Sequence, residues 1–294
     1  MLNGWLIYQS TDANQNQALI QRFFQKAPKY QIQLHLILWE HLQIGIHSNQ
    51  NILIYQNNPV HPPHFIIMRT IDHILSSFFQ QIGVLLLNPY EISTLANHKF
   101  KTYLAMKKLE IPILPTFYYT KEKLQNTQNF PLPFPFVCKS CTGRSGNEVF
   151  LIQSQKDLQN RLQNISQPSE WILQPLAPVI GRDLRVFVVG KSIIGAILRI
   201  NETDFRANYS LSQTAKWYVL SEKEKTLVNR IVQAYEFGFV GIDFLFDADG
   251  NFIFNEIEDV VGSRTLSIYS NIDAVDLYLK YIDETLKTQK TTLH

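Results

Sequence analysis

An acidic hairpin near the end of the chain limits the possible folds more than any other segment. Residues 239–259 read FVGIDFLF, DADG and NFIFNEIED, and the Asp-Ala-Asp-Gly stretch has the chemistry of a turn between two strands. Counting outward from that turn brings Asp243 opposite Asn255 or Glu256. The two-residue period of a strand puts Glu256 and Glu258 on one face, so we expect three carboxylates to converge.

The phenylalanines and isoleucines around these acids indicate that the hairpin is buried. An unpaired buried carboxylate is costly or takes up a proton, so such a cluster needs a cation. Carboxylate oxygens with no histidine or cysteine nearby favour Mg²⁺, which usually completes its shell with water and substrate phosphates. The hairpin therefore predicts a magnesium site beside ATP, formed by Asp243, Glu256 and Glu258. The alternative is a solvated edge strand with polar alternation.

The chain is long enough for more than one domain. Its 294 residues are 45% hydrophobic, which allows a large core divided over two or three units. A net charge of +2, without a cluster of Lys and Arg on a helix face, argues against nucleic acid as a partner. The N-terminus has no basic segment ahead of its apolar run, and no stretch approaches about 18 uncharged apolar residues. We therefore expect no membrane contact and a cytoplasmic location.

The first third of the chain has the pattern of a small open sheet. Strand-like runs occur at residues 4–8, 32–39, 65–73 and 83–89. A helix-like stretch at 17–25 separates the first two runs, which is a βαβ pattern, and an apolar helix separates the last two. Pro89 then breaks the pattern, and we place the N-terminal domain at residues 1–92.

Two later helices are marked by their ends. The helix predicted at 93–109 carries Lys99 and is ended by the prolines of EIPILP, which cannot continue it. The helix predicted at 221–237 begins with a capping box, in which Ser221 is followed three residues later by Glu224.

The central segment carries a lone lysine ahead of a glycine loop. Lys139 lies in the extended run FPFVCKS, on the opposite pleat face from Cys138. The loop TGRSG at 142–146 follows, and its glycines would let backbone N–H groups approach a phosphate closely. The alternative is an ordinary turn with a lysine that reaches solvent. The common nucleotide folds are disfavoured, because the chain has neither a Walker loop nor G-x-G-x-x-G after its first strand.

Further charges are embedded in the strands that follow. GRDLRVFVVG and SIIGAILRI are predicted strands, and they carry Asp183, Arg185 and Arg199 among apolar neighbours. Embedded charges need partners. Arg206 and Asn208 come next in the loop segment DFRAN, where an arginine could fork onto phosphate or carboxylate oxygens.

The order of these pieces resembles the ATP-grasp ligases, and among them the ribosomal-protein-S6 glutamate-ligase (RimK-like) group. The resemblance covers nearly the whole chain and rests on P-x-x-P-T, the strand lysine with its glycine loop, GRDLRVFVVG, DFRAN, GID and NEIE. It implies an α/β ATP-grasp fold, α+β in its ATP-binding part. The domains would be an N-terminal open-sheet (pre-ATP-grasp) domain at 1–92, a central lid subdomain at 93–172 and a C-terminal subdomain with the magnesium site at 173–294.

The resemblance also implies a role for each matching residue. The nucleotide would be bound by Lys99, Lys139, Thr142, Gly143, Ser145, Gly146, Gln174, Pro175, Leu176, Asp183, Arg206 and Asn208. The catalytic group would be Arg206, Asn208, Arg185 and Arg199, the last two near the acyl phosphate or an acceptor carboxylate. Two Mg²⁺ ions, or Mn²⁺ in their place, would be held by Asp243, Glu256 and Glu258.

The sequence departs from the group's pattern in several places. Gln174 stands where the hinge normally carries an acid, and Glu258 stands where the third metal ligand is normally asparagine. The extra charge of Glu258 can be absorbed by two Mg²⁺ ions, so we expect metal binding to survive. SLSQT replaces the glycine pair expected after Asn208, and DVVGSR replaces Pro-Gly after the last ligand. Arg264 in that segment could meet a substrate carboxylate or make a surface ion pair.

The implied activity is an ATP-dependent carboxylate–amine ligase that works through an acyl phosphate. It would join an amino acid to a peptide, protein or small amino-acid acceptor, and the central subdomain would act as a lid that excludes water. One alternative is a macrocyclising ligase that modifies a precursor peptide. The other is a regulatory protein that binds ATP without catalysis. A homo-oligomer is compatible with each.

Overall fold

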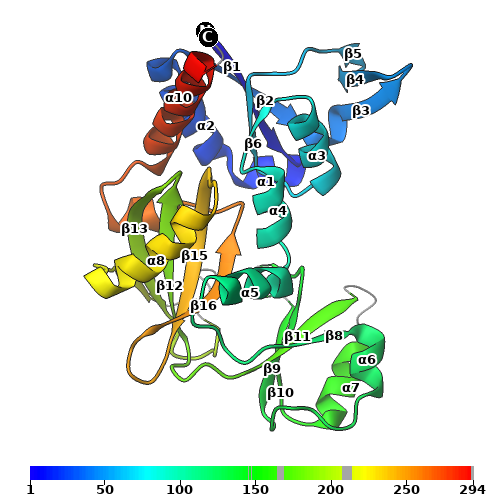
Figure 1. Cartoon of the computed structure of the whole chain (residues 1–294), viewed down its shortest axis with the longest axis vertical. Coiled ribbons are helices and arrows are strands. Elements are labelled where there is room, and N and C mark those ends of the chain that lie inside the picture. The colour runs from blue at the N-terminus through cyan, green and yellow to red at the C-terminus, as the bar shows by residue number, and fades with distance from the viewer. Residues whose placement is uncertain (145, 147, 164–168, 207–213, 293–294) are drawn as a thin grey trace.

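The computed structural model describes residues 1–144, 146, 148–163, 169–206 and 214–292, with side chains up to residue 289. Within these ranges the protein has one parallel and three antiparallel sheets, with helices packed on them (Figure 1). The predicted mixed α/β architecture is therefore confirmed. No helix in the described part of the chain is both long and apolar enough to cross a bilayer.

The N-terminal part is a four-stranded parallel sheet in the order β2-β1-β6-β7. Its strands are β1 (Leu2–Tyr8), β2 (Ile32–Leu38), β6 (Phe65–Met68) and β7 (Leu85–Leu87), and its helices are α1 (Ser10–Gln15), α2 (Gln17–Lys26) and α3 (His73–Gln81). Alternate residues of β1 and β6 pack into two separate cores, because both faces of this sheet are covered. The predicted βαβ pattern is confirmed.

A small antiparallel sheet that sequence reasoning missed projects from this part (Figure 1). It contains β3 (Leu42–His47), β4 (Gln50–Tyr55) and β5 (Asn58–Pro59), and it follows the short helices η1 (Ala27–Tyr30) and η2 (Trp39–His41). Its two turns place Ser48, Asn49, Gln56 and Asn57 at positive φ. Such tight turns are usually recognised in a sequence by glycine, and these two turns contain no glycine.

The helix predicted at 93–109 is in fact two helices, α4 (Tyr90–Ala96) and α5 (Lys99–Lys108). Asn97 ends α4 and donates its side-chain amide to the Ser93 carbonyl at 2.8 Å. His98 then caps α5 by accepting a hydrogen bond from the Lys101 amide. Because of this break, Lys99 is the first residue of α5 and not a residue of a helix interior.

The central part is a four-stranded antiparallel sheet in the order β10-β9-β11-β8, covered by two helices (Figure 1). Its strands are β8 (Phe117–Thr120), β9 (Phe136–Ser140), β10 (Val149–Ile152) and β11 (Glu170–Pro175), and its helices are α6 (Lys121–Asn126) and α7 (Gln155–Gln163). Its own hydrophobic core includes Phe136, Cys138, Leu158 and Trp171. In β9, Cys138 enters this core while Lys139 points to the opposite side, as the strand period predicts.

The C-terminal part is a five-stranded antiparallel sheet in the order β14-β13-β12-β15-β16. Its strands are β12 (Arg182–Val189), β13 (Ser192–Ile200), β14 (Thr214–Trp217), β15 (Phe239–Phe246) and β16 (Phe252–Glu258), and its helices are α8 (Glu222–Ala234), α9 (Arg264–Tyr269) and α10 (Ala274–Thr292). The predicted capping box at Ser221 and Glu224 begins α8. The predicted hairpin is β15 with β16, and Asp243 lies opposite Glu256.

The N-terminal and C-terminal parts share one hydrophobic core. This core joins Leu6 and Phe65 of the parallel sheet to Phe187 and Phe239 of the antiparallel sheet and to Tyr278 of α10. Helix α10 returns to lie beside α2 (Figure 1). The domain boundaries at 92 and 172 stay predictions, although the central part has the core most clearly its own.

Candidate active site

A pocket with an empty volume of about 810 Å³ lies between the central and C-terminal sheets. Residues from the start of α5, from β9, from the end of β11 and from β16 line it. Among the predicted site residues, the pocket is lined by Lys99, Lys139, Gly143, Gly146, Pro175, Leu176, Asp183, Arg206 and Glu256. Residues more than 150 positions apart in sequence are therefore gathered around one space.

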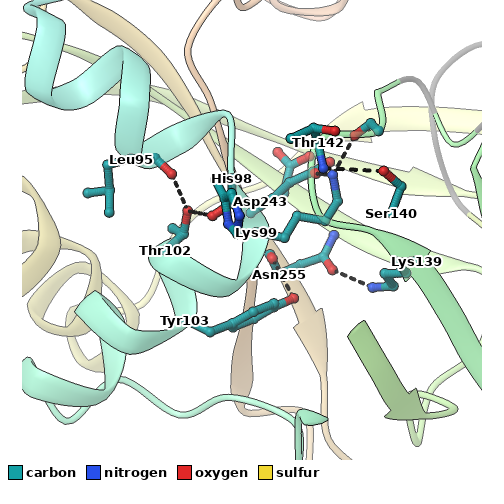
Figure 2. A network of polar contacts seen from close by, with 12 residues as sticks. Leu95, His98, Lys99, Thr102, Tyr103, Lys139, Ser140, Thr142, Asp243 and Asn255 are labelled. Carbon is teal, nitrogen blue, oxygen red and sulfur yellow. Dashed lines mark hydrogen bonds and ion pairs between the residues drawn. The ribbon is translucent and has the colours of Figure 1, made fainter. Parts of the chain in front are cut away.

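Lys99 enters the pocket from the first turn of α5 (Figure 2). Its Nζ atom donates to the Gly143 carbonyl at 2.6 Å and lies 3.4 Å from Glu256 Oε2. The Lys99 backbone amide donates to the Cys141 carbonyl at 2.8 Å. The helix start is thus bound to the end of β9, and the lysine is held between the glycine loop and the acidic hairpin.

Lys139 approaches the same space from β9 and donates to Asn255 Oδ1 at 3.1 Å (Figure 2). The side chain is partly buried and lines the pocket, and its role there stays a prediction. Burial lowers the pKa of the Lys139 amine to about 8, with the Glu256 carboxylate raising that pKa and the Lys99 amine lowering it. A buried amine with only a neutral amide for a hydrogen-bond partner would be stabilised by an anion in the pocket.

A bulge in β16 explains how Asn255 and Glu256 both face the pocket. Asp243 lies opposite Glu256, but Phe244 lies opposite Phe254, so Asn255 is an extra residue on β16. A bulge bends its strand and re-aims side chains that would otherwise alternate between faces. The Tyr103 hydroxyl of α5 donates to the Asn255 carbonyl at 2.7 Å and binds the bulged residue to the helix that carries Lys99 (Figure 2).

The glycine loop lies against the pocket without a bulky side chain. A Cβ atom on Gly143 would fall 2.5 Å from Glu148 Oε2 and 3.0 Å from Ser140 Cβ, so a larger residue would require these side chains to shift. Arg206 reaches across from the loop after β13 and donates to the Gly146 carbonyl at 3.0 Å, while Asp204 binds the same guanidinium at 2.7 Å. Thr142 lines a smaller neighbouring pocket. Ser145 and Asn208 lie outside the described residues.

At the base of the pocket, Pro175 and Leu176 line the wall, and Gln174 does not. Gln174 is 1% exposed and donates to Thr116 Oγ1 at 2.8 Å. The residue that replaces the usual hinge acid is therefore used inside the protein, and it binds the segment that enters β8.

Two arginines form ion pairs with the carboxylates on the central strands of the C-terminal sheet. Arg199 binds Asp183 through Nε at 2.6 Å and Asp243 through Nη2 at 2.8 Å. Arg185 binds both oxygens of Asp243, at 2.8 and 2.7 Å, and its Nη1 contacts Glu258 Oε2. Burial alone would raise the Asp243 pKa, but Arg185 and Arg199 together hold that pKa at about 2.

Carboxylate oxygens are suitable ligands for Mg²⁺, but these three side chains are not arranged around one common point. Glu256 lines the first pocket, and Glu256 and Glu258 together line the smaller one. Glu258 Oε2 is buried and accepts no hydrogen bond of good geometry, although the Arg185 guanidinium contacts it. Burial raises the Glu258 pKa, and a bound divalent cation would lower it. Both oxygens of Asp243 are bound by arginines, and within the described ranges no three His, Cys, Asp or Glu side chains gather closely enough to hold a metal. The predicted backbone register is confirmed, and the metal assignment stays a prediction.

A second large pocket, with an empty volume of about 1070 Å³, lies on the other side of Glu258. Arg185, Arg199 and Glu258 line its inner end, and its outer lip is lined by Gln15, Asn16, Arg22, Arg264 and Thr265. Arg22 binds Asp273 at 3.1 Å, whereas Arg264 has no acidic partner among the residues that the structure describes. The N-terminal helices α1 and α2 therefore form one wall of a cationic opening.

The site also contains residues that sequence reasoning missed or undervalued. Asn88, at the end of the N-terminal sheet, donates to Asp259 Oδ1 at 2.7 Å and accepts from the Gly238 amide at 2.6 Å. Asn97 donates to the other Asp259 oxygen at 3.0 Å. Asn255 could have been suspected as a second candidate opposite Asp243, whereas nothing in the sequence pairs Asn88 with Asp259.

A pocket held between two antiparallel sheets, with lysines from one side and carboxylates from the other, defines the ATP-grasp class of protein. The solved ATP-grasp structure of a RimK domain protein from Sphaerobacter thermophilus has this fold, with a TM-score of 0.74 at 15% identity over 95% of this chain and 98% of that one. The predicted ATP-grasp fold is thereby confirmed. The sequence profile of the RimK-like ATP-grasp domain matches residues 96–282, and the chain belongs to this family.

Similar proteins differ in how much is known of them. An uncharacterised protein of Mycoplasma pneumoniae is 26% identical over 89% of this chain and 85% of its own length. Human N-acetylaspartylglutamate synthase A is 29% identical over 72% of this chain, and the match spans 56% of that protein.

Proposed function

We propose that this protein is an ATP-dependent ligase that joins a carboxylate to an amine. The observation that carries the proposal is the convergence of Lys99, Lys139 and Glu256 on one pocket between the two sheets. Two partly buried cations and an adjacent carboxylate are what a triphosphate with its metal requires. Membership of the RimK-like ATP-grasp family supports the same assignment.

In this proposal, Lys99 and Lys139 bind the phosphates, and Pro175 and Leu176 form the wall for the base. The loop around Gly143 and Gly146 lies over the phosphates, with Arg206 bound to it. Mg²⁺ would be held by Glu256 and Glu258. Asp243 would become a third ligand if Arg185 or Arg199 released one of the Asp243 carboxylate oxygens. The metal would supply charge neutralisation at the phosphates as they react.

The reaction needs no nucleophile from the protein. An oxygen of the substrate carboxylate attacks the γ-phosphorus of ATP, ADP leaves, and an acyl phosphate forms. The amine nitrogen then attacks the acyl carbon, inorganic phosphate leaves with the electron pair of the C–O bond, and the amine loses a proton. The protein's part is to position the carboxylate, stabilise the charge and exclude water.

The second pocket is the proposed place for the carboxylate and amine substrates. It meets the smaller pocket beside the nucleotide site at Glu258, has Arg185 at its inner end and opens at Arg22 and Arg264. A carboxylate at the inner end would lie beside Arg185, and a further carboxylate of an amino acid or peptide would meet Arg264. The name of the human relative, a synthase of an acetylated dipeptide, supports an amino acid as one substrate.

The proposal is tested by screening amino acids in pairs, with and without short peptides, for phosphate release from ATP and Mg²⁺. We expect ADP and phosphate to form only when a carboxylate and an amine substrate are both present, and mass analysis to show one amide per phosphate. Phosphate release that needs a single peptide, with loss of one water from its mass, would instead identify a macrocyclising enzyme. ADP binding without turnover in any combination would favour the regulatory alternative.

A further inference from the structure

A polar cluster outside the pocket joins α5 to the central sheet. It consists of His98, Tyr118 and Glu170, which come from the start of α5, from β8 and from β11. The Tyr118 hydroxyl donates to Glu170 Oε1 at 2.5 Å, and His98 Nε2 lies 3.3 Å from Glu170 Oε2. Each oxygen of the Glu170 carboxylate therefore has a side-chain partner. The hydrogen bond from Tyr118 lowers the Glu170 pKa, so the acid is ionised at neutral pH.

The two nitrogens of His98 have separate tasks. Nδ1 accepts a hydrogen bond from the Lys101 amide and so caps α5. Because Nδ1 is the acceptor, the ring proton of the neutral imidazole lies on Nε2, which faces Glu170. The ring is 12% exposed and is held from both sides. One side chain thus accepts a hydrogen bond from one of the free N–H groups at the start of a helix and joins that helix to a neighbouring sheet.

The residue that follows His98 in the chain is Lys99. Its backbone amide donates to Cys141 at the end of β9, and its amine donates to Gly143 in the glycine loop. Phe100 stacks on Tyr118 with ring centroids 5.0 Å apart. The first turn of α5 is therefore fixed to the central sheet, whereas Tyr103, one turn later, is bound to β16 of the C-terminal sheet.

We propose that His98, held by Glu170, is a positioning residue that sets the place of the Lys99 amine in the nucleotide pocket. The inference rests on the proposed function, since it assigns a role at the same site. A lysine has a long side chain with many rotamers, so its amine is placed well only if its backbone is fixed. His98 and Glu170 fix that backbone without touching the nucleotide.

The test separates this role from simple capping. His98→Asn keeps a good N-cap residue but is too short to reach Glu170. We expect this variant to retain most of its thermal stability. It should bind ADP with Mg²⁺ on the order of tenfold more weakly, because a displaced Lys99 amine would lose about one charged hydrogen bond to the phosphates. In turnover the KM for ATP should rise by a similar factor, while kcat changes little. Glu170→Ala should give the same weakening, and the double variant should be no weaker than either single one.

Thr120→Ala is the matched control. Thr120 caps α6 in the same central part by accepting from the Lys123 amide. It pairs with Glu170 across β8 and β11, but within the described residues it makes no hydrogen bond to the side chains of His98, Lys99 or Glu170. We expect this variant to lose stability through its lost cap while its ADP affinity stays that of the wild type. Wild-type ADP affinity in His98→Asn would overturn the positioning role alone. A wild-type protein that binds no ADP would overturn the proposed function as well, so the two failures are distinguishable by calorimetry.

Discussion

At the scale of single residues, the two lysines of the pocket differ in what holds them. Lys99 has a carbonyl and a carboxylate within reach, and Lys139 has the Asn255 amide. Burial lowers the pKa of Lys139 to about 8. An anion that enters the pocket would therefore stabilise the charged form of Lys139.

The first prediction concerns charge removal at this point. Lys139→Ala and Glu256→Gln should each reduce turnover below detection, because one removes a phosphate contact and the other a metal oxygen. Both should leave the circular dichroism spectrum and thermal transition close to those of the wild type. Full activity in either variant would show that the nucleotide site is misplaced.

The second prediction follows from the Lys139 pKa. Phosphate oxygens beside the amine raise its pKa above about 8, so nucleotide binding should take up a proton around that pH. At pH 8 the uptake should be about half a proton, falling toward zero near pH 6.5, where the free amine is already charged. Affinity should weaken as the pH rises above 8. Calorimetry in two buffers of different ionisation enthalpy measures the uptake, and Lys139→Arg, always charged, should show none.

At the scale of elements, two local irregularities shape the pocket. The bulge in β16 turns Asn255 and Glu256 toward the same space. The turn before β12 brings the backbone of Gly181 against the loop that carries Arg206, with Gly181 accepting from the Asn201 amide at 2.8 Å. Gly181 has a φ of +67°, and a Cβ there would lie 2.1 Å from the Asn201 carbonyl.

The third prediction uses this contact. Gly181→Ala should lower the free energy of unfolding by about 2–4 kcal/mol, since backbone strain and a clash with a carbonyl combine. Gly250→Ala is the matched control, because Gly250 also has positive φ, +83°, but has nothing within 4 Å of the new Cβ. That variant should lose only about 1 kcal/mol. Denaturant unfolding compares the two, and equal losses would mean that the clash is relieved at no cost.

At the scale of the whole molecule, a buried polar node links the N-terminal sheet to the acidic hairpin. Asp259 is 7% exposed and accepts hydrogen bonds from Asn88 and Asn97, while Asn88 also donates to the Phe239 carbonyl at 3.1 Å. The residue next to Glu258 is therefore held by the N-terminal part and by α4. Asp259 therefore holds the end of the acidic hairpin against the N-terminal part.

The fourth prediction follows from this node. Asp259→Asn replaces an acceptor oxygen with an N–H₂ group that faces another amide donor, so the free energy of unfolding should fall by about 1–3 kcal/mol. Asp249→Asn, in the exposed turn of the same hairpin, should change it by less than about 0.5 kcal/mol. Thermal unfolding of both variants provides the measurement. Unchanged stability of Asp259→Asn would show that the node contributes little to holding the parts together.

The sequence by itself determined the βαβ pattern of the N-terminal sheet, the turn between β15 and β16, the register that places Asp243 against Asn255 or Glu256, and the face of β9 on which Lys139 lies. These follow from local patterns: strand period, turn chemistry and charges in apolar runs, which act over a few residues. Motif order then sufficed to indicate the ATP-grasp fold.

Only the tertiary structure decided which partner each embedded charge takes. Arg185 and Arg199 bind Asp243, Gln174 turns into the interior, His98 meets Glu170, and Asn88 meets Asp259 across 171 residues of sequence. An arginine satisfies any carboxylate within reach, so the choice depends on distances set by the packing of whole sheets and not on spacing along the chain. The small sheet of β3, β4 and β5 was not predicted from the sequence for a related reason. Its turns have non-glycine residues at positive φ, which the surrounding strands impose.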